Sequence, residues 1–195
     1  YGDKINRIHW NLSSKTDEIM VKEYSLPVSS HIVIVFEFCT DPSSENRFSK
    51  NDASIETAMS LSYYMIRNNI SHKICWYDPR TKLFHSEKIA TEDDFSTFLG
   101  AIFISGTYKD SISAFIHHKS ENYDKHFSHT LYISPVLSDE IYHNLSVLTN
   151  SYKKTYIHIS DDSSSVPEFF CTTDSITAAS VDYRNLAAGL NSIII

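Results

Sequence analysis

The chain has 195 residues, of which 42% are apolar, and a formal net charge of −7. This length and composition allow one domain with a sizeable core, and the lack of any basic stripe argues against a nucleic-acid partner. The three cysteines lie far apart without C-x-x-C spacing, which favours neither a disulfide framework nor a zinc knuckle. No run reaches the roughly 18 apolar residues of a membrane-spanning helix, and both ends resemble domain boundaries, so we expect a soluble piece of a longer protein.

The first strong secondary-structure signal is the run His31 to Phe38, which is nearly all β-branched and aromatic. Such a run is typical of a strand buried on both faces, so we expect the central strand here. The polar segment 39–51 is predicted to be a loop at the C-terminal end of this strand. A helix capped by Asp52 or Ser54 is then expected to place one apolar face on the sheet, formed by Ile55, Ala58, Met59, Ser62, Met65 and Ile66.

Strands and helices alternate along the rest of the chain. Residues 73–77 and 83–88 are expected to form an edge hairpin around the turn 78–81. Thr91 and Asp94 resemble a capping box that starts a helix ending near Gly106. Further predicted elements are a short helix with Ile112, Phe115 and Ile116, a strand at 129–134, a helix capped by Ser138, strands at 155–160 and 176–181, and a helix at 183–190.

This order of elements predicts an α/β fold with a largely parallel sheet, one antiparallel edge strand, and helices on both faces. In such sheets a ligand binds where the strand order reverses, beyond the C-terminal ends of two adjacent strands. Here that position is expected between the loops 39–51 and 134–138. We therefore predict a partner-binding crevice formed by Glu37, Cys39, Asp41, Ser43, Ser44 and Ser134.

The N-terminal quarter of the chain resembles a known family. The residues before the first hydrophobic strand are similar to the signature of the "domain of unknown function 58" proteins: Tyr1-Gly2-Asp3, Arg7-Ile8-His9-Trp10, Leu12-Ser13 and Val21-Lys22-Glu23-Tyr24. The resemblance implies a von Willebrand factor A-like, Rossmann-like three-layer domain over 31–195, with 1–30 as a signature segment packed on it. Members typically have transmembrane helices upstream and occur beside MoxR-type AAA ATPases. The resemblance thus implies a bacterial membrane-anchored adaptor whose soluble domain lies on the cytoplasmic side.

Related von Willebrand A domains bind a divalent cation through an Asp-x-Ser-x-Ser motif after the first strand. The matching positions here carry Glu37, Cys39 and Asp41, and Ser134 stands where many relatives supply an aspartate. Mg²⁺ prefers oxygen ligands, and a cysteine is a poor one. These departures imply a degenerate metal site, and no cofactor is expected. Glu37, Asp41 and Ser43 are the groups that could still hold Mg²⁺ or Mn²⁺.

Two other sets of residues suggest different chemistry. A transition-metal site could use His117, His118, His126, His129 and Asp124, although surface histidines near a helix end explain this pattern equally well. A hydrolase could use Cys39 or the acidic pair Asp161-Asp162. The chain has four glycines and none of the G-x-x-x-x-G-K-[ST], G-x-G-x-x-G or G-x-S-x-G motifs, which weighs against nucleotide binding and the common serine hydrolases.

The leading prediction is therefore a non-enzymatic protein-interaction module, with a MoxR-type AAA ATPase as the partner that the resemblance implies. The first alternative is a metal-dependent adhesion or adaptor domain. The second alternative is an undetected hydrolase. Fold class alone does not choose among these functions, because the same kind of sheet carries many of them.

Overall fold

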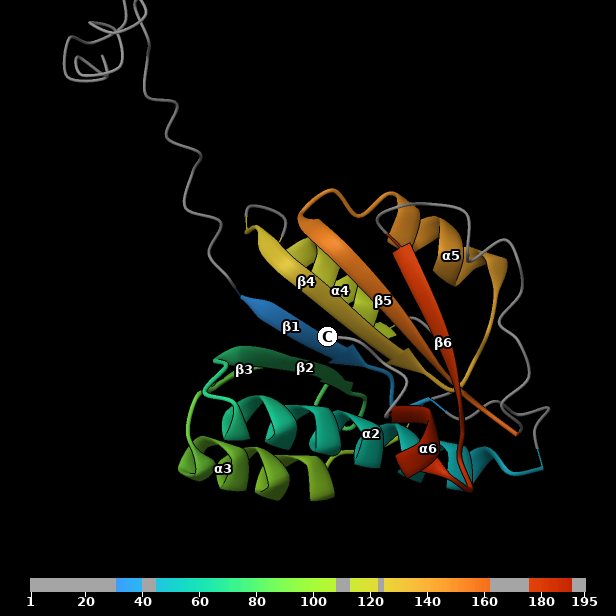
Figure 1. The fold of residues 1–195 in the computed structure, drawn as a ribbon, viewed down its shortest axis with the longest axis horizontal. Helices are drawn as coiled ribbons and strands as arrows, with labels where there is room; N and C mark the ends of the chain where they lie inside the picture. The colour runs from blue at the N-terminus through green and yellow to red at the C-terminus, as the bar shows by residue number, and fades with distance from the viewer. Residues whose placement is uncertain (1–30, 40–44, 108–112, 123–124, 162–175, 191–195) are drawn as a thin grey trace, which may run out of the picture.

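The computed structural model describes residues 31–39, 45–107, 113–122, 125–161 and 176–190. Within these ranges, six strands form one sheet in the order β3-β2-β1-β4-β5-β6, with helices on both of its faces (Figure 1). The strands are β1 (Ile32–Phe36), β2 (His72–Asp78), β3 (Leu83–Ile89), β4 (Phe127–Ser134), β5 (Ser151–Ser160) and β6 (Ile176–Asp182). The helices are α2 (Arg47–Arg67), α3 (Glu92–Phe103), α4 (Ser113–Glu121), α5 (Asp139–Ser146) and α6 (Leu186–Leu190).

Neighbouring strands of the sheet are parallel, except for β2 and β3. These two form an antiparallel hairpin that pairs without interruption from His72 opposite Ile89 to Asp78 opposite Leu83. The predicted sheet, mostly parallel with one antiparallel edge strand, is therefore confirmed. The strand order reverses between β1 and β4, because the chain places β2 and β3 on one side of β1 and β4, β5 and β6 on the other.

The sheet separates two hydrophobic clusters. Ile34 and Phe36 of β1 enter the cluster under α2, α3 and α6, whereas Val33 and Val35 enter the cluster under α4 and α5. Figure 1 shows these two helical layers below and above the sheet. Successive side chains of a strand point to opposite faces, so a central strand between two helical layers needs apolar residues at every position. This explains why the run that begins at His31 is so uniformly hydrophobic.

Helix α2 begins earlier than the sequence predicts. The sequence favours Asp52 or Ser54 as the cap, but the helix begins at Arg47. Lys50, in its first turn, is buried, and its ammonium group lies 2.5 Å from the carboxylate of Asp161 at the end of β5. This ion pair links residues distant in sequence, and the spacing of apolar residues does not reveal it. The prediction of a loop through residue 51 is therefore wrong at its C-terminal end.

Helix α3 begins as predicted but ends sooner. The Thr91 hydroxyl accepts a hydrogen bond from the Asp94 N–H at 3.1 Å, and the Asp94 carboxylate accepts one from the Thr91 N–H at 2.9 Å. The capping box is thus confirmed. The helix ends at Phe103, short of Gly106, and the Gly106 N–H donates to the Asp78 carboxylate at 3.0 Å. The segment after the helix therefore turns toward the tip of the β2–β3 hairpin.

The helices of the described ranges are each too short or too polar to cross a membrane.

Replacing Thr91 by alanine removes the hydroxyl half of the capping box. We expect the free energy of unfolding to fall by about 1 kcal/mol, the usual cost of losing an N-cap side chain. Urea denaturation followed by circular dichroism measures this loss. Thr97→Ala is the matched control, because Thr97 is exposed on the same helix and its hydroxyl donates only to the Asp93 carbonyl one turn earlier. Equal losses in the two variants would contradict the capping role.

Candidate functional site

The candidate site lies at the C-terminal ends of β1 and β4, which are adjacent and parallel. Their pairing continues beyond β1, because the Glu37 N–H donates to the Ile133 carbonyl at 3.0 Å. The strand order reverses between these two strands, which is the position where open α/β sheets bind their ligands. Of the six residues predicted for the crevice, three are described at this edge: Glu37, Cys39 and Ser134. Asp41, Ser43 and Ser44 lie outside the described residues.

Glu37 is fully buried, and both of its carboxylate oxygens accept hydrogen bonds. Oε1 accepts from the Phe115 N–H at 3.0 Å and from the Tyr132 hydroxyl at 2.9 Å. Oε2 accepts from the Ala114 N–H at 3.0 Å. Ala114 and Phe115 belong to the first turn of α4, where backbone N–H groups have no partner within the helix and the helix dipole favours an anion. Glu37 therefore connects the central strand to the N-terminus of α4.

Sequence reasoning singled out Glu37 but missed the groups that it binds. The sequence predicts a residue of the partner-binding crevice that could also hold a cation. The donors on α4 are 77 and 78 residues away along the chain. A buried acidic residue directly after a hydrophobic strand signals that it needs donors, because an unpaired buried carboxylate is costly. That signal does not identify the helix that supplies them.

The arrangement of Glu37 does not fit a ligand of a divalent cation. A carboxylate that coordinates Mg²⁺ must direct an oxygen toward an open position with room for further oxygen ligands or water. Here the carboxylate is buried and faces the N–H groups of α4, so a cation would have to replace hydrogen-bond donors that already compensate its charge. In the part of the chain that the structure describes, no group of three or more His, Cys, Asp or Glu side chains is placed to hold a metal ion.

Ser134 and the residues after it form a loop that is fixed to the sheet. The Ser134 hydroxyl accepts a hydrogen bond from the Val136 N–H at 3.1 Å, and the Tyr156 hydroxyl donates to the Val136 carbonyl at 2.5 Å. Burial raises the pKa of Tyr156 well above its ordinary value, so its hydroxyl stays protonated and remains a donor at neutral pH. Val136 and Leu137 are only half-buried, which leaves apolar surface on a loop with a defined backbone.

Cys39 is buried beside these groups and forms no disulfide. A nucleophilic thiol must meet its substrate, and reactive cysteines are accordingly at least partly exposed. The Cys39 side chain has no exposed surface, so a substrate could reach its sulfur only after local opening of this edge. The structure therefore gives no support to the thiol version of a hydrolase.

The acidic residue that follows β5 anchors the start of α2. The Asp161 carboxylate lies 2.5 Å from the Lys50 ammonium and accepts a hydrogen bond from the Asn46 side chain at 3.1 Å. The hydrogen bonds from Lys50 and Asn46 hold the pKa of Asp161 below its ordinary value. Asp161 thus remains ionised and paired. Asp162, the other member of this acidic pair, lies outside the described residues.

Three of the four described histidines that suggested a transition-metal site, His117, His118 and His129, have different neighbours. His117 stacks on Tyr77, with ring centroids 4.7 Å apart. His118, also on α4, packs against the ring of Phe127 at 5.4 Å. His129 points to the opposite face of the sheet, where its Nε2 lies 2.8 Å from the Thr155 hydroxyl. These three side chains therefore do not meet at one point, and Asp124 lies outside the described residues.

Comparison with solved structures identifies the fold. The chain is similar to the crystal structure of the SpRpn10 VWA domain, with a TM-score of 0.53 and 15% sequence identity. The match covers 84% of this chain and 95% of that chain. No family model matches the chain, and a search of curated proteins gives no match. At 15% identity the similarity shows a von Willebrand factor A-like fold and no more.

The Glu37→Gln variant should lose about 3 kcal/mol of unfolding free energy. The substitution removes the negative charge, so the hydrogen bonds are no longer charge-assisted. The NH2 group of the new amide would also face the donors of α4 and Tyr132, which leaves at least one of them without an acceptor. Tyr132→Phe removes one donor and should cost about half as much. Urea denaturation measures both losses. Glu56→Gln is the matched control, because Glu56 is exposed on α2. A Glu37→Gln loss no larger than that of the control would contradict the anchoring role.

His118 should make stability depend on pH. Burial, together with the nearby positive charges of Lys73 and Lys125, lowers its pKa from 6.5 to about 4 in the folded state. As pH falls, the unfolded chain therefore binds a proton at His118 before the folded chain does. The contribution of His118 to the free energy of unfolding is complete above pH 6.5 and is lost progressively toward pH 4. The shift corresponds to about 3 kcal/mol.

Unfolding free energies of wild type and His118→Gln at about pH 7 and about pH 5 test this expectation. The loss between the two pH values should be smaller in the variant by about 2 kcal/mol. Burial also lowers the pKa of His129 and His158 to about 4, so the variant keeps part of the pH dependence. His143→Gln, on the exposed side of α5, is the matched control. If His118→Gln loses as much unfolding free energy between the two pH values as wild type does, His118 does not titrate as described.

Proposed function

We propose that this von Willebrand factor A-like domain is a non-enzymatic protein-interaction module that binds its partner at the C-terminal ends of β1 and β4 without a divalent cation. The observation that carries the proposal is the state of Glu37. Its carboxylate, at the end of the first strand, is buried and bonded to the first turn of α4. The negative charge that would attract a cation is thus already compensated by the protein.

The segments that follow β1 and β4 in the chain contain suitable groups for a protein partner. The segment after β1 contains Asp41, Ser43 and Ser44, which can accept and donate hydrogen bonds. The loop after β4 presents the half-buried side chains of Val136 and Leu137 on a backbone that Ser134 and Tyr156 hold in place. Apolar contacts on a fixed loop, surrounded by polar groups, are the usual composition of a protein interface. A rigid loop also loses little conformational entropy on binding.

We also propose that the chain belongs to the "domain of unknown function 58" family, and that its partner is a MoxR-type AAA ATPase on the cytoplasmic side of a bacterial membrane. Attachment to the membrane would come from segments outside this chain. Support for this part comes from the N-terminal residues alone, such as Tyr1-Gly2-Asp3 and Arg7-Ile8-His9-Trp10, which lie outside the described residues. The experiment below tests the partner directly.

Affinity capture from bacterial membrane and soluble lysate, with the chain as bait, tests the proposed function. We expect the same partner in excess Mg²⁺ and in EDTA. Asp41→Ala should weaken its binding by about 1 kcal/mol or more, the threshold for a significant interface residue. Asp93→Ala, in the first turn of α3 at the opposite edge of the sheet, removes the same charge from an exposed position and is the control.

The metal-dependent alternative gives the opposite results. Capture would be lost in EDTA, and Mg²⁺ or Mn²⁺ would raise the melting temperature of the chain, because a ligand that binds only the native state stabilises it. Either result would overturn the cation-free interaction. Equal binding by wild type and Asp41→Ala would instead remove the loop after β1 from the interface.

A further inference from the structure

Strand β3 forms one rim of the sheet and pairs with β2 on one side only. No other described strand lies beside it, and Figure 1 shows it at the opposite rim from β6. Four of its seven side chains are exposed, on both faces of the strand: Leu83, Ser86, Glu87 and Lys88. The two helical layers therefore leave this rim open. An uninterrupted edge strand presents backbone N–H and C=O groups that can pair with another strand.

Side-chain contacts on both faces hold β3 in a fixed orientation. On the α3 face, the His85 ring stacks on Trp76 with centroids 4.6 Å apart and an interplanar angle of 8°. On the α4 face, Phe84 stacks with His117 at 6.0 Å, and the Cys75 thiol donates to the Ser86 hydroxyl at 3.4 Å. The strand is thus ordered along its length before any partner arrives, so pairing would cost little additional ordering.

We propose that β3 pairs antiparallel with β3 of a second copy of the chain, so that the two sheets join across a twofold axis at Ser86. In an antiparallel ladder, alternate residues direct both backbone groups to the same side of the strand. Opposed residues of two identical edges must both direct these groups toward the partner strand or both away from it. The twofold axis between the two edges can therefore pass through a residue, but not between two residues. The register centred on Ser86, the middle residue of β3, is the one that overlaps all seven residues.

Cross-strand neighbours in this register are complementary. Each His85 lies opposite Glu87 of the second copy, each Phe84 lies opposite Lys88, and each Leu83 lies opposite Ile89. Hydrogen-bonding polar pairs, cation–aromatic contacts and apolar pairs all stabilise directly opposed positions. The next registers, centred on His85 or Glu87, oppose two histidines or two glutamates instead. Charged residues on edge strands normally prevent indiscriminate pairing, and here they disfavour every close register except one.

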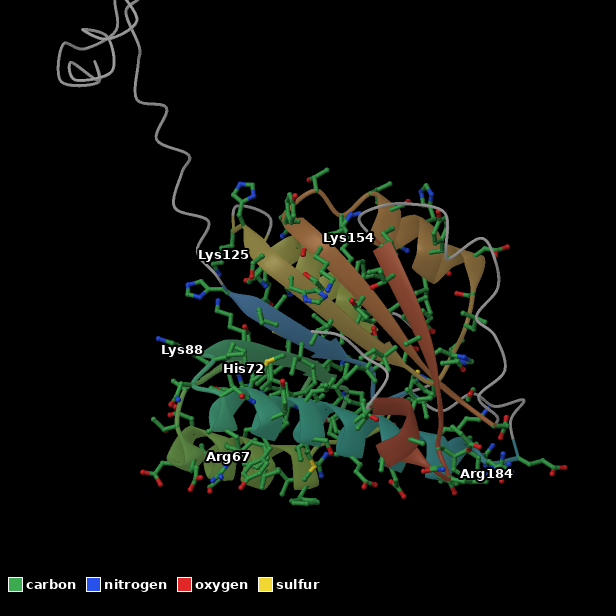
Figure 2. All side chains as sticks on the ribbon, in the orientation of Figure 1. Arg67, His72, Lys88, Lys125, Lys154 and Arg184 are labelled. Carbon is green, nitrogen blue, oxygen red and sulfur yellow. The ribbon has the colours of Figure 1, made fainter. Side chains whose placement is uncertain are left out.

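The same side chains are poorly matched within their own sheet. Glu87 lies opposite Ile74, which offers no charge to its carboxylate. Lys88 lies opposite Lys73, and like charges at opposed positions repel. Figure 2 shows Lys88 projecting away from the body of the domain at this rim. A second copy would place a histidine beside each Glu87 and an aromatic ring beside each Lys88.

The expected association is weak. A seven-residue strand pair buries less than the roughly 1,600 Å² of a standard interface, and the exposed side chains contribute only modestly. The dimer should therefore appear at high protein concentration. Strand β2 lies between β3 and β1, so β3 is not one of the strands that lead into the candidate site, and the inference does not rest on the proposed function.

Sedimentation equilibrium of the full chain over a concentration series tests the proposal, with Glu87→Lys as the principal variant. We expect a monomer–dimer equilibrium in wild type. The variant places a lysine side chain opposite His85 of the second copy, twice in each dimer, and should raise the dissociation constant about tenfold. Glu56→Lys makes the same charge change on the exposed face of α2 and is the matched control. Hydrogen exchange should show slower amide exchange in β3, and not in α5, as the concentration rises.

Three outcomes would overturn the proposal. The wild-type chain could stay monomeric at all concentrations, or Glu56→Lys could weaken the dimer as much as Glu87→Lys. A dimer whose β3 amides gain no protection would have formed through another surface. If the β3 amides of a monomeric chain gain protection only in complex with a captured protein, the edge receives a strand from that protein and not from a second copy.

Discussion

The buried carboxylate of Glu37 and the N-terminus of α4 depend on each other. A carboxylate without donors is very costly in a protein interior, and the first N–H groups of a helix also carry a cost when they are buried without acceptors. Here two backbone N–H groups and the Tyr132 hydroxyl satisfy the carboxylate, while the carboxylate satisfies the helix. Because β1 lies at the centre of the sheet and α4 in the layer above it, this one contact positions a helical layer relative to the strand where the candidate site begins.

A second polar contact has the same role on the other face. The Lys50–Asp161 ion pair joins the first turn of α2 to the end of β5, so that both helical layers are fixed at the C-terminal edge of the sheet. The C-terminal ends of β1 and β4, where we propose that a partner binds, therefore belong to a rigid base. Buried charges elsewhere in this type of fold can serve a cation, but at these two positions the protein itself supplies the compensating groups.

The sequence predicted the parts of the fold that depend on local patterns. Apolar runs identified β1 and β4, the spacing of Thr91 and Asp94 identified the start of α3, and the turn at 78–81 identified the hairpin. It failed where a distant partner decides the outcome. The first turn of α2 depends on Asp161, and the role of Glu37 depends on donors that follow 77 and 78 residues later. Of the six predicted crevice residues, the three described ones are buried and the other three lie outside the described residues, so the crevice stays a prediction.

The β2–β3 hairpin also bears on the order in which the sheet assembles. Its strands are joined by a short turn, and Asp78 pairs with Leu83 only a few positions further along the chain. The central pairing of β1 with β4, in contrast, brings Ile32 to His129 across most of the domain. Closing a short loop costs less chain entropy than closing a long one, so local contacts form faster. The hairpin can therefore form early, whereas the pairing of the two strands that carry the candidate site must close a much longer stretch of chain.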